Sequence, residues 1–188
     1  MYDVAIIGAG PAGASAALFI AKAGKQVLLV DNDKSITKRA WMENHYGVME
    51  ISGPDLMETG INQAKRFGTE VTQEEVQQIK KEENGFVLQG ENGTYSAQQV
   101  ILATGMSTDL GAELGLEVVP GTEPRVKSIY KVDEEGRTSL PGVWAAGICA
   151  GVSLHTIITA GDGAKVAINL LSAMNGQRYV DHDVYQPK

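Results

Sequence analysis

Cysteine is almost missing from this chain: Cys149 is alone among 188 residues, so no disulfide can form within it. A chain without disulfides is typical of the reducing cytosol, and we predict a cytoplasmic location. Basic residues are outnumbered, with 16 Lys and Arg against 23 Asp and Glu and a net charge of -7. This balance argues against nucleic acid or an anionic membrane as a partner. No run approaches the ~20 apolar residues of a membrane span, and Asp3 does not fit a signal peptide.

Apolar residues make up 43% of the chain, which is enough to build a hydrophobic core. The length lies at the upper end of the range for one ordinary domain. The sequence also contains no internal repeat and no low-complexity tract. We therefore expect residues 1–188 to form a single domain.

The N-terminal residues carry the clearest pattern. An apolar stretch of strand length at 2–7 leads into the glycine-rich turn 8–13, and a helical pattern follows over 14–23. A second strand is expected over 26–30 and ends at Asp31. Strand, turn, helix and strand in this order form a βαβ unit.

The turn has the Gly-x-Gly-x-x-Gly spacing of a dinucleotide-binding site. Gly8 permits a tight bend, Gly10 lets a pyrophosphate approach the backbone, and Gly13 lets the helix pack on the strand. The helix N-terminus directs N–H groups and the positive end of its dipole at the phosphates. Asp31 follows Gly8 at close to the spacing of about 20 residues that is expected for a carboxylate binding ribose hydroxyls. These features together predict a bound dinucleotide.

Further along, regular and irregular segments alternate. Asn-Gly pairs at 84 and 92 divide residues 70–96 into the short strands of a three-stranded antiparallel meander. Residues 34–50 have no clear period and are interpreted as a long functional loop, and residues 106–124 also show little periodicity. The other expected elements are a helix over 54–67, a buried strand over 100–103, strands over 125–132 and 143–146, and a C-terminal helix over 156–174.

Four segments extend the pattern beyond the first turn. They are Tyr2–Gly13 (YDVAIIGAGPAG), Glu43–Gly47 (ENHYG) with Ser52–Met57 (SGPDLM), Ala103–Gly105 (ATG) and Gly136–Gly147 (GRTSLPGVWAAG). In this order they resemble the thioredoxin reductase group of FAD-dependent pyridine nucleotide–disulfide oxidoreductases. The resemblance covers most of residues 1–105 and 125–172, and it implies that the βαβ unit holds FAD.

The resemblance implies an α/β fold: a Rossmann-like FAD-binding domain with a central parallel sheet, helices and a small antiparallel β-meander. The turn would hold the pyrophosphate and Asp31 the ribose, although the family more often has Glu there. The backbone of Val76 would contact the adenine, and Asn44 would lie near the flavin ring. The cofactor-binding residues implied in this way are Gly8, Gly10, Ala12, Gly13, Asp31, Asn44, Val76, Thr104, Gly105, Gly147, His155 and Thr156.

The chain departs from the family pattern in four places. Residues 106–140 leave too little room before the C-terminal signature for a second nucleotide-binding domain, so we expect no NADPH site of the chain's own. The redox-active Cys-x-x-Cys is absent, which excludes a disulfide reductase of the usual kind. Ile148 stands where the family has an acid that bonds the ribityl chain, and Tyr46 replaces a family proline.

Several side chains have both a functional and a structural interpretation. Cys149 is either a thiol beside the flavin or a small buried residue. His155 is either a flavin contact with a part in proton transfer or a polar residue at a helix start. His45 and Trp41 either cover the flavin or line a substrate cleft, or they fill the core of their loop. Charged residues on the meander, Glu74, Glu75 and 80–83, are interpreted as solvated, and the scattered histidines suggest no metal site.

The predicted function is that of a FAD-dependent oxidoreductase, in which the cofactor carries the chemistry. Electrons would come from diffusing NAD(P)H, a small substrate or a partner protein. The alternative is a non-catalytic FAD-binding module that acts as a redox subunit or sensor. A site for NAD or ADP-ribose also stays open because of Ile148. A homodimer that covers the flavin is expected.

Overall fold

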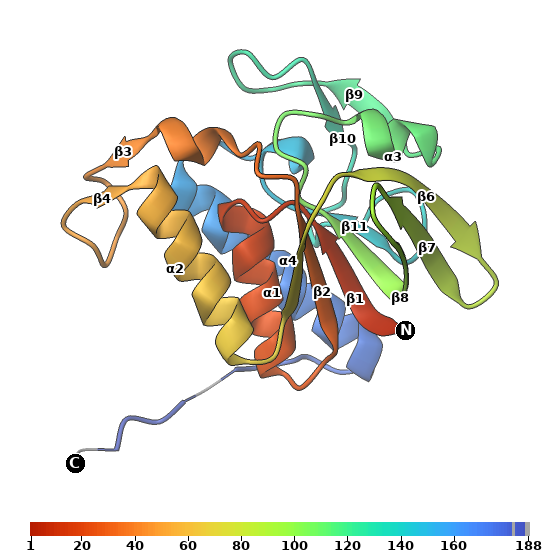
Figure 1. The fold of residues 1–188 in the computed structure, drawn as a ribbon, viewed down its shortest axis with the longest axis horizontal. Coiled ribbons are helices and arrows are strands. Elements are labelled where there is room, and N and C mark those ends of the chain that lie inside the picture. The colour runs from red at the N-terminus through yellow and green to blue at the C-terminus, as the bar shows by residue number, and fades with distance from the viewer. Residues whose placement is uncertain (182, 187–188) are drawn as a thin grey trace.

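The computed structural model describes residues 1–181 and 183–186. Strands and helices alternate at the start of the chain, short strands dominate its middle, and one long helix follows near its end (Figure 1). In chain order the elements are β1 (Tyr2–Ile7), α1 (Pro11–Lys22), β2 (Val27–Asp31), the 3-10 helix η1 (Ile36–Arg39), β3 (Trp41–Met42), β4 (Ile51–Ser52), α2 (Gly53–Arg66), β5 (Glu70–Gln73), β6 (Val76–Glu82), β7 (Gly85–Gly90), β8 (Thr94–Leu102), α3 (Asp109–Glu113), β9 (Val118–Pro120), β10 (Ser128–Tyr130), β11 (Val143–Ala145), the 3-10 helix η2 (Ile148–Ala150) and α4 (Thr156–Asn175).

A seven-stranded sheet holds the molecule together, in the order β5-β2-β1-β8-β7-β6 with β11 also paired to β8. The strands β5, β2, β1, β8 and β11 run parallel, whereas β6 and β7 are antiparallel to their neighbours. The expected α/β fold with a parallel centre and an antiparallel meander is confirmed. The meander is not separate, however, because β8 belongs to both parts: its Ala97 pairs with Tyr2 on one side and with Phe86 on the other.

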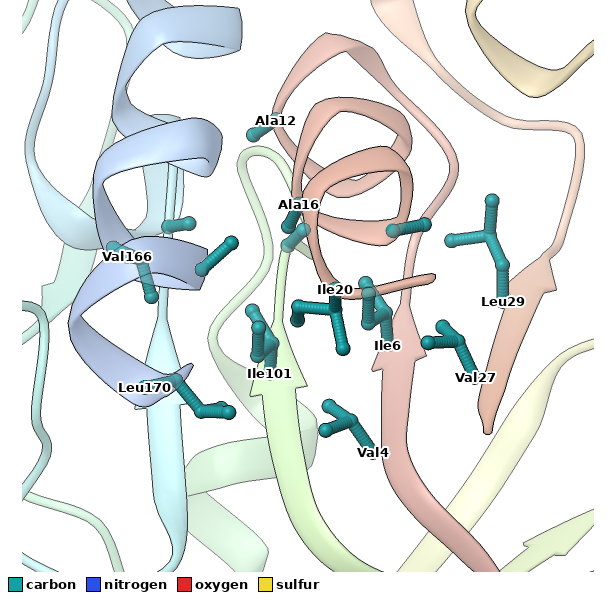
Figure 2. Packing of buried hydrophobic residues seen from close by; sticks show 14 of the residues in the cluster. Val4, Ile6, Ala12, Ala16, Ile20, Val27, Leu29, Ile101, Val166 and Leu170 are labelled. Atoms are coloured by element: carbon teal, nitrogen blue, oxygen red, sulfur yellow. The ribbon is translucent and has the colours of Figure 1, made fainter. Parts of the chain in front are cut away.

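The two faces of the sheet bury two different apolar clusters. Alternate residues of β1 point to opposite faces, with Val4 and Ile6 on one and Ala5 and Ile7 on the other, as the two-residue period of a strand dictates. The first face is covered by α1 and α4, and Figure 2 shows Ala16 and Ile20 of α1 among the side chains of this cluster. The second cluster also contains residues of β6, β7 and β10.

Helix α1 is rich in alanine, which brings its neighbours close. Ala12 and Ala16 lie on the side of α1 that faces α4 (Figure 2). On α2, a Cβ added at Gly60 would lie 3.3 Å from the Cβ of Ala14. Small residues at these contacts let α2 and α4 pack closely against the first turns of α1.

The structure contains short elements that the sequence pattern did not reveal. Residues 106–124 include α3 and β9, and the strand expected over 125–132 is reduced to β10, which pairs with β9. The loop expected over 34–50 contains η1 and β3. Elements of two to five residues are too short to show a period, so their sequence gave no signal. Within the described residues, every helix is too short or too polar to cross a lipid bilayer.

Candidate functional site

A cavity of about 370 Å³ opens at the carboxyl ends of the parallel strands. It follows the ends of β1, β2 and β8 and reaches the start of β6 and the residues after β11. This is the edge at which doubly wound sheets bind ligands. Among the expected cofactor-binding residues, those that line the cavity are Gly8, Gly10, Ala12, Asp31, Val76, Thr104 and Gly105.

The glycine turn forms one wall of the cavity, and its backbone leaves no room for larger residues. Gly8 has a φ of +102°, and a Cβ there would lie 2.3 Å from the carbonyl oxygen of Ala103. A Cβ at Gly13 would lie 1.8 Å from the carbonyl oxygen of Gly8. Gly13 does not line the cavity, and its role is to let α1 pack on the turn.

Gly10 precedes α1 and lacks a side chain that could cap the helix. The nearest atom that a Cβ at Gly10 would meet is Oγ of Ser35, at 3.3 Å. The first N–H groups of a helix have no partner within the helix, and they sit at its positive end. The turn therefore presents backbone donors to the cavity in the way that suits a phosphate group.

Asp31 lies at the end of β2, where it is buried and lines the cavity. Its Oδ1 accepts a hydrogen bond from the N–H of Asp33 at 3.0 Å. Among the described residues, none donates to Oδ2. The carboxylate is thus fixed by one oxygen and available through the other, as a ribose-binding carboxylate must be.

Glu74 was expected to be solvated, and this prediction is wrong because Glu74 is buried at 5% exposure and lines the cavity. Its carboxylate accepts hydrogen bonds from the Tyr95 hydroxyl, from the N–H of Asn92 at 3.0 Å and from the Thr72 hydroxyl at 3.4 Å. The Tyr95 hydroxyl is the main reason why the pKa of Glu74 lies below its ordinary value. Glu74 thereby ties the meander to the cavity, while 80–83 are exposed as expected.

The floor of the cavity follows β8. Gly105 adopts a φ of +66°, and the hydroxyl of Thr104 donates to the carbonyl oxygen of Ser107 at 2.6 Å. The side-chain bond fixes the sharp turn that leaves the strand. Thr104 and Gly105 both line the cavity.

Another wall of the cavity is formed after β11, where Ala146 and Ile148 line it. Gly147 lies between them with a φ of +82°, and its N–H donates to Oδ2 of Asp162 at 2.8 Å. Gly147 itself does not line the cavity. Asp162 lies on α4, and sequence spacing gave no sign of this bond.

A second, smaller cleft of about 120 Å³ shares Gly10 and Pro11 with the first, so the two meet at the start of α1. His45 lines it, together with residues of α1, α2 and α4. Nδ1 of His45 lies 3.0 Å from the Thr156 hydroxyl, which joins the loop to the start of α4. Asn44 is exposed and lines neither cavity.

Other candidates from the sequence lie outside the cavities. Trp41 is 62% exposed and Tyr46 is 91% exposed, so Trp41 does not fill the core of its loop. His155 is exposed, and its Nδ1 lies 2.8 Å from the Ser153 hydroxyl. Thr156 contacts His45 but lines neither cavity.

Cys149 lies beneath the wall and not at its surface. Its thiol is fully buried and donates to the carbonyl oxygens of Leu102 and Ala146, each at 3.3 Å. Burial is the main cause that raises the pKa of this thiol to about 11. A protonated, inaccessible thiol is a poor nucleophile, which favours the structural interpretation of Cys149.

Among the described residues, no three His, Cys, Asp or Glu side chains are grouped so that they could hold a metal ion. The charged groups of the cavity are instead a carboxylate on β2, one before β6 and the ion pair of Lys34 with Glu75. Such a lining suits an organic ligand with hydroxyl groups and a backbone-bound phosphate.

Comparisons with known proteins agree with this geometry. The sequence matches the family described as "Pyridine nucleotide-disulphide oxidoreductase" over residues 2–116 and 71–164. A thioredoxin reductase of Peptoclostridium acidaminophilum is 35% identical over 125 residues, which is 64% of this chain and 40% of the relative. One of Helicobacter pylori is 40% identical over 113 residues, 57% of this chain and 36% of the relative. The chain thus spans about 40% of the length of such relatives.

Solved structures extend the likeness to the whole fold. A thioredoxin reductase from Gloeobacter violaceus aligns with a TM-score of 0.81 at 18% identity, over 98% of this chain and 99% of that chain. An atypical thioredoxin reductase from Desulfovibrio vulgaris Hildenborough aligns with a TM-score of 0.77 at 20% identity, over 94% of this chain and 99% of that chain. At such identities the likeness shows the fold alone.

Proposed function

Because this chain belongs to the pyridine nucleotide-disulphide oxidoreductase family, we propose that it binds FAD and acts as a flavin-dependent oxidoreductase that takes electrons from an external donor. The observation that carries the proposal is the cavity at the strand ends. It is lined by the glycine turn, by a buried carboxylate at the end of β2 and by the start of β6. These features suit the pyrophosphate, the ribose and the adenine of a dinucleotide, respectively.

The residues present fit the adenosine diphosphate half of FAD. Gly10 and the N–H groups at the start of α1 suit the pyrophosphate. The free Oδ2 of Asp31 suits a ribose hydroxyl, and Val76 borders the same cavity where the adenine would lie. The volume of about 370 Å³ lies within the range of ligand sites, roughly 300–1,000 Å³.

The flavin half would extend along the wall at Ala146 and Ile148 toward the second cleft. FAD supplies two-electron chemistry when bound, and the chain's part is to bind, orient and shield it. His45 is the titratable side chain at this cleft. Its Nδ1 is engaged by the Thr156 hydroxyl, which leaves Nε2 to exchange a proton with a molecule bound there.

The structure of residues 106–140 supports the proposal of an external donor. All of them are described, and they form α3, the β9–β10 pair and the approach to β11, with no second glycine turn between a strand and a helix. Diffusing NAD(P)H, a small substrate or a partner protein would therefore reduce the flavin. A cysteine pair takes no part, because Cys149 is the one cysteine of the sequence.

The proposal is tested by anaerobic titration of the FAD-loaded protein with NADH and then NADPH, followed at the flavin absorbance bands. Bleaching within seconds at micromolar donor would support an oxidoreductase that uses a diffusing nicotinamide. Bands that persist with both nucleotides and with dithionite-reduced carrier proteins would contradict the catalytic part of the proposal.

A non-catalytic FAD-binding module is the second candidate, and one observation favours it. The only thiol near the proposed flavin site is fully buried and stays protonated, so the disulfide chemistry that the names of the relatives describe has no counterpart here. In that case the protein binds FAD stoichiometrically, and the flavin is reduced by dithionite but by none of the biological donors.

A further inference from the structure

The wall that follows β11 is held from two sides. It consists of residues 146–150, in which Ala146 and Ile148 border the large cavity and Cys149 points into the core. The wall is bonded to the sheet through the Ala146 N–H, which donates to the carbonyl oxygen of Leu102 at 2.9 Å, and η2 is a single turn. Beyond that bond, side chains from other elements help to hold its position.

The first anchor is apolar. Ile148 is buried at 8% exposure in a small cluster with Val126 and Ile129, and Val119 packs against them. These partners belong to the segment from β9 to β10, which lies outside the main sheet (Figure 1) and packs against Ile148. An isoleucine at this position is explained by that contact, and it leaves the wall without a polar group of its own at residue 148.

The second anchor is a carboxylate on α4. The side chain of Asp162 is only 6% exposed, and its Oδ2 accepts the Gly147 N–H at 2.8 Å. Its Oδ1 lies 2.7 Å from Nζ of Lys165, which is half exposed. A charge-assisted hydrogen bond thus links α4 to the backbone of the wall.

The next residue ties the same turn of α4 to the glycine turn. A Cβ at Gly163 would lie 2.0 Å from the carbonyl oxygen of Ala12, and a Cβ at Gly147 would lie 2.8 Å from the Cβ of Ala12. The wall, α4 and the glycine turn thus meet at a single point. A shift of the Gly147 amide would move the wall relative to the glycine turn.

We propose that Asp162 is the positioning residue of the cofactor site: its buried carboxylate holds the Gly147 N–H and so sets the distance between the Ala146–Ile148 wall and the glycine turn. The proposal rests on the proposed FAD site. It assigns to α4 the polar group that orders this wall, in a chain where Ile148 is engaged in apolar packing.

Three variants test the proposal by FAD titration of the flavin-free protein. Asp162→Ala leaves the buried Gly147 N–H unpaired and should weaken FAD binding about tenfold or more. Asp162→Asn keeps an oxygen that can accept the same bond and should restore most of the affinity. Lys165→Ala removes only the exposed half of the ion pair and serves as the matched control, with affinity within about twofold of wild type.

Two results would overturn the proposal. One is an Asp162→Ala protein that melts as wild type does and binds FAD equally well. The other is a loss of affinity in Lys165→Ala as large as that in Asp162→Ala, since the ion pair would then be the part that matters.

A second measurement keeps the test open if Asp162→Ala does not fold. In wild type, the amide proton of Gly147 should resonate downfield, as a proton hydrogen-bonded to a carboxylate does, and Asp162→Asn should move it upfield. A Gly147 resonance that is the same in both proteins contradicts the proposal. This spectrum needs no flavin, so a wild-type protein that binds no FAD would refute the proposed function and leave the Asp162 contact to be judged separately.

Discussion

Replacement of Gly163 by alanine should both destabilise the protein and weaken its cofactor site. The new Cβ would lie 2.0 Å from the carbonyl oxygen and 2.9 Å from the Cα of Ala12. Both are backbone atoms of the turn that borders the cavity, so no side-chain rotation can relieve the contact. Either α4 moves away from α1 or the glycine turn is displaced.

The matched control is two residues earlier in the same helix. Gly161 is exposed, and a Cβ there would meet no atom within 4 Å. Gly161→Ala therefore gains only helix propensity, and it should stabilise the protein by about 0.5–1 kcal/mol. Forcing a methyl group into a packed interface costs about 1–3 kcal/mol, and the rigid partner places Gly163→Ala in the upper part of that range.

These free energies translate into melting temperatures. A protein of this size changes its Tm by about 2–4 °C per kcal/mol. Thermal denaturation of the flavin-free protein should thus show Gly163→Ala melting roughly 4–12 °C below wild type and Gly161→Ala about 1–4 °C above it. A Gly163→Ala protein that melts at or above the wild-type temperature would refute the close packing of α4 on the glycine turn.

Three further perturbations follow from the site. Gly10→Ala should leave the Tm unchanged, because the new Cβ meets only the Ser35 side chain at 3.3 Å, but it should weaken FAD binding about tenfold by crowding the phosphate turn. The Cys149 thiol, buried and with a pKa of about 11, should not react with a thiol reagent at pH 8 until the protein is unfolded; prompt reaction of the folded protein would contradict its burial. Glu74→Gln should lower the Tm at pH 7 by a few degrees, about 1 kcal/mol for the lost charged acceptor. The pKa of Glu74 in the folded protein lies below its ordinary value. Its contribution to stability is therefore complete above the ordinary pKa and is lost as the pH falls through the folded pKa. The difference in Tm between variant and wild type should thus shrink in acid, and a difference that grows would show that the pKa of Glu74 is raised on folding.

The parts of the fold that sequence alone predicted are those with a local cause. The turn from Gly8 to Gly13 was predictable because its glycines are required by close contacts that are largely local. A Cβ at Gly13, for example, would collide with the carbonyl oxygen of Gly8. The helix α4 and the buried strand ends were predictable from apolar periodicity. In these cases residues close in sequence determine the conformation.

The parts that sequence did not predict depend on partners distant along the chain. In the sequence Glu74 looks like a surface charge, but the folded meander places Tyr95 and Asn92 within hydrogen-bond distance of it. Asp162 looks like an ordinary helix residue, but its carboxylate accepts the N–H of Gly147, which lies 15 positions earlier. Both are carboxylates whose role is set by desolvation and by backbone donors, and no local pattern encodes either.

The flavin content of the purified protein tests the central claim most directly. The protein should be loaded with FAD, passed through a desalting column and examined by its absorbance spectrum, with Asp31→Ala as the comparison. Wild type should show flavin bands at one FAD per chain, and the variant, whose cavity lacks the carboxylate at the end of β2, should lose most of its bound flavin. A wild-type protein that emerges without flavin bands would show that the cavity is not a FAD site.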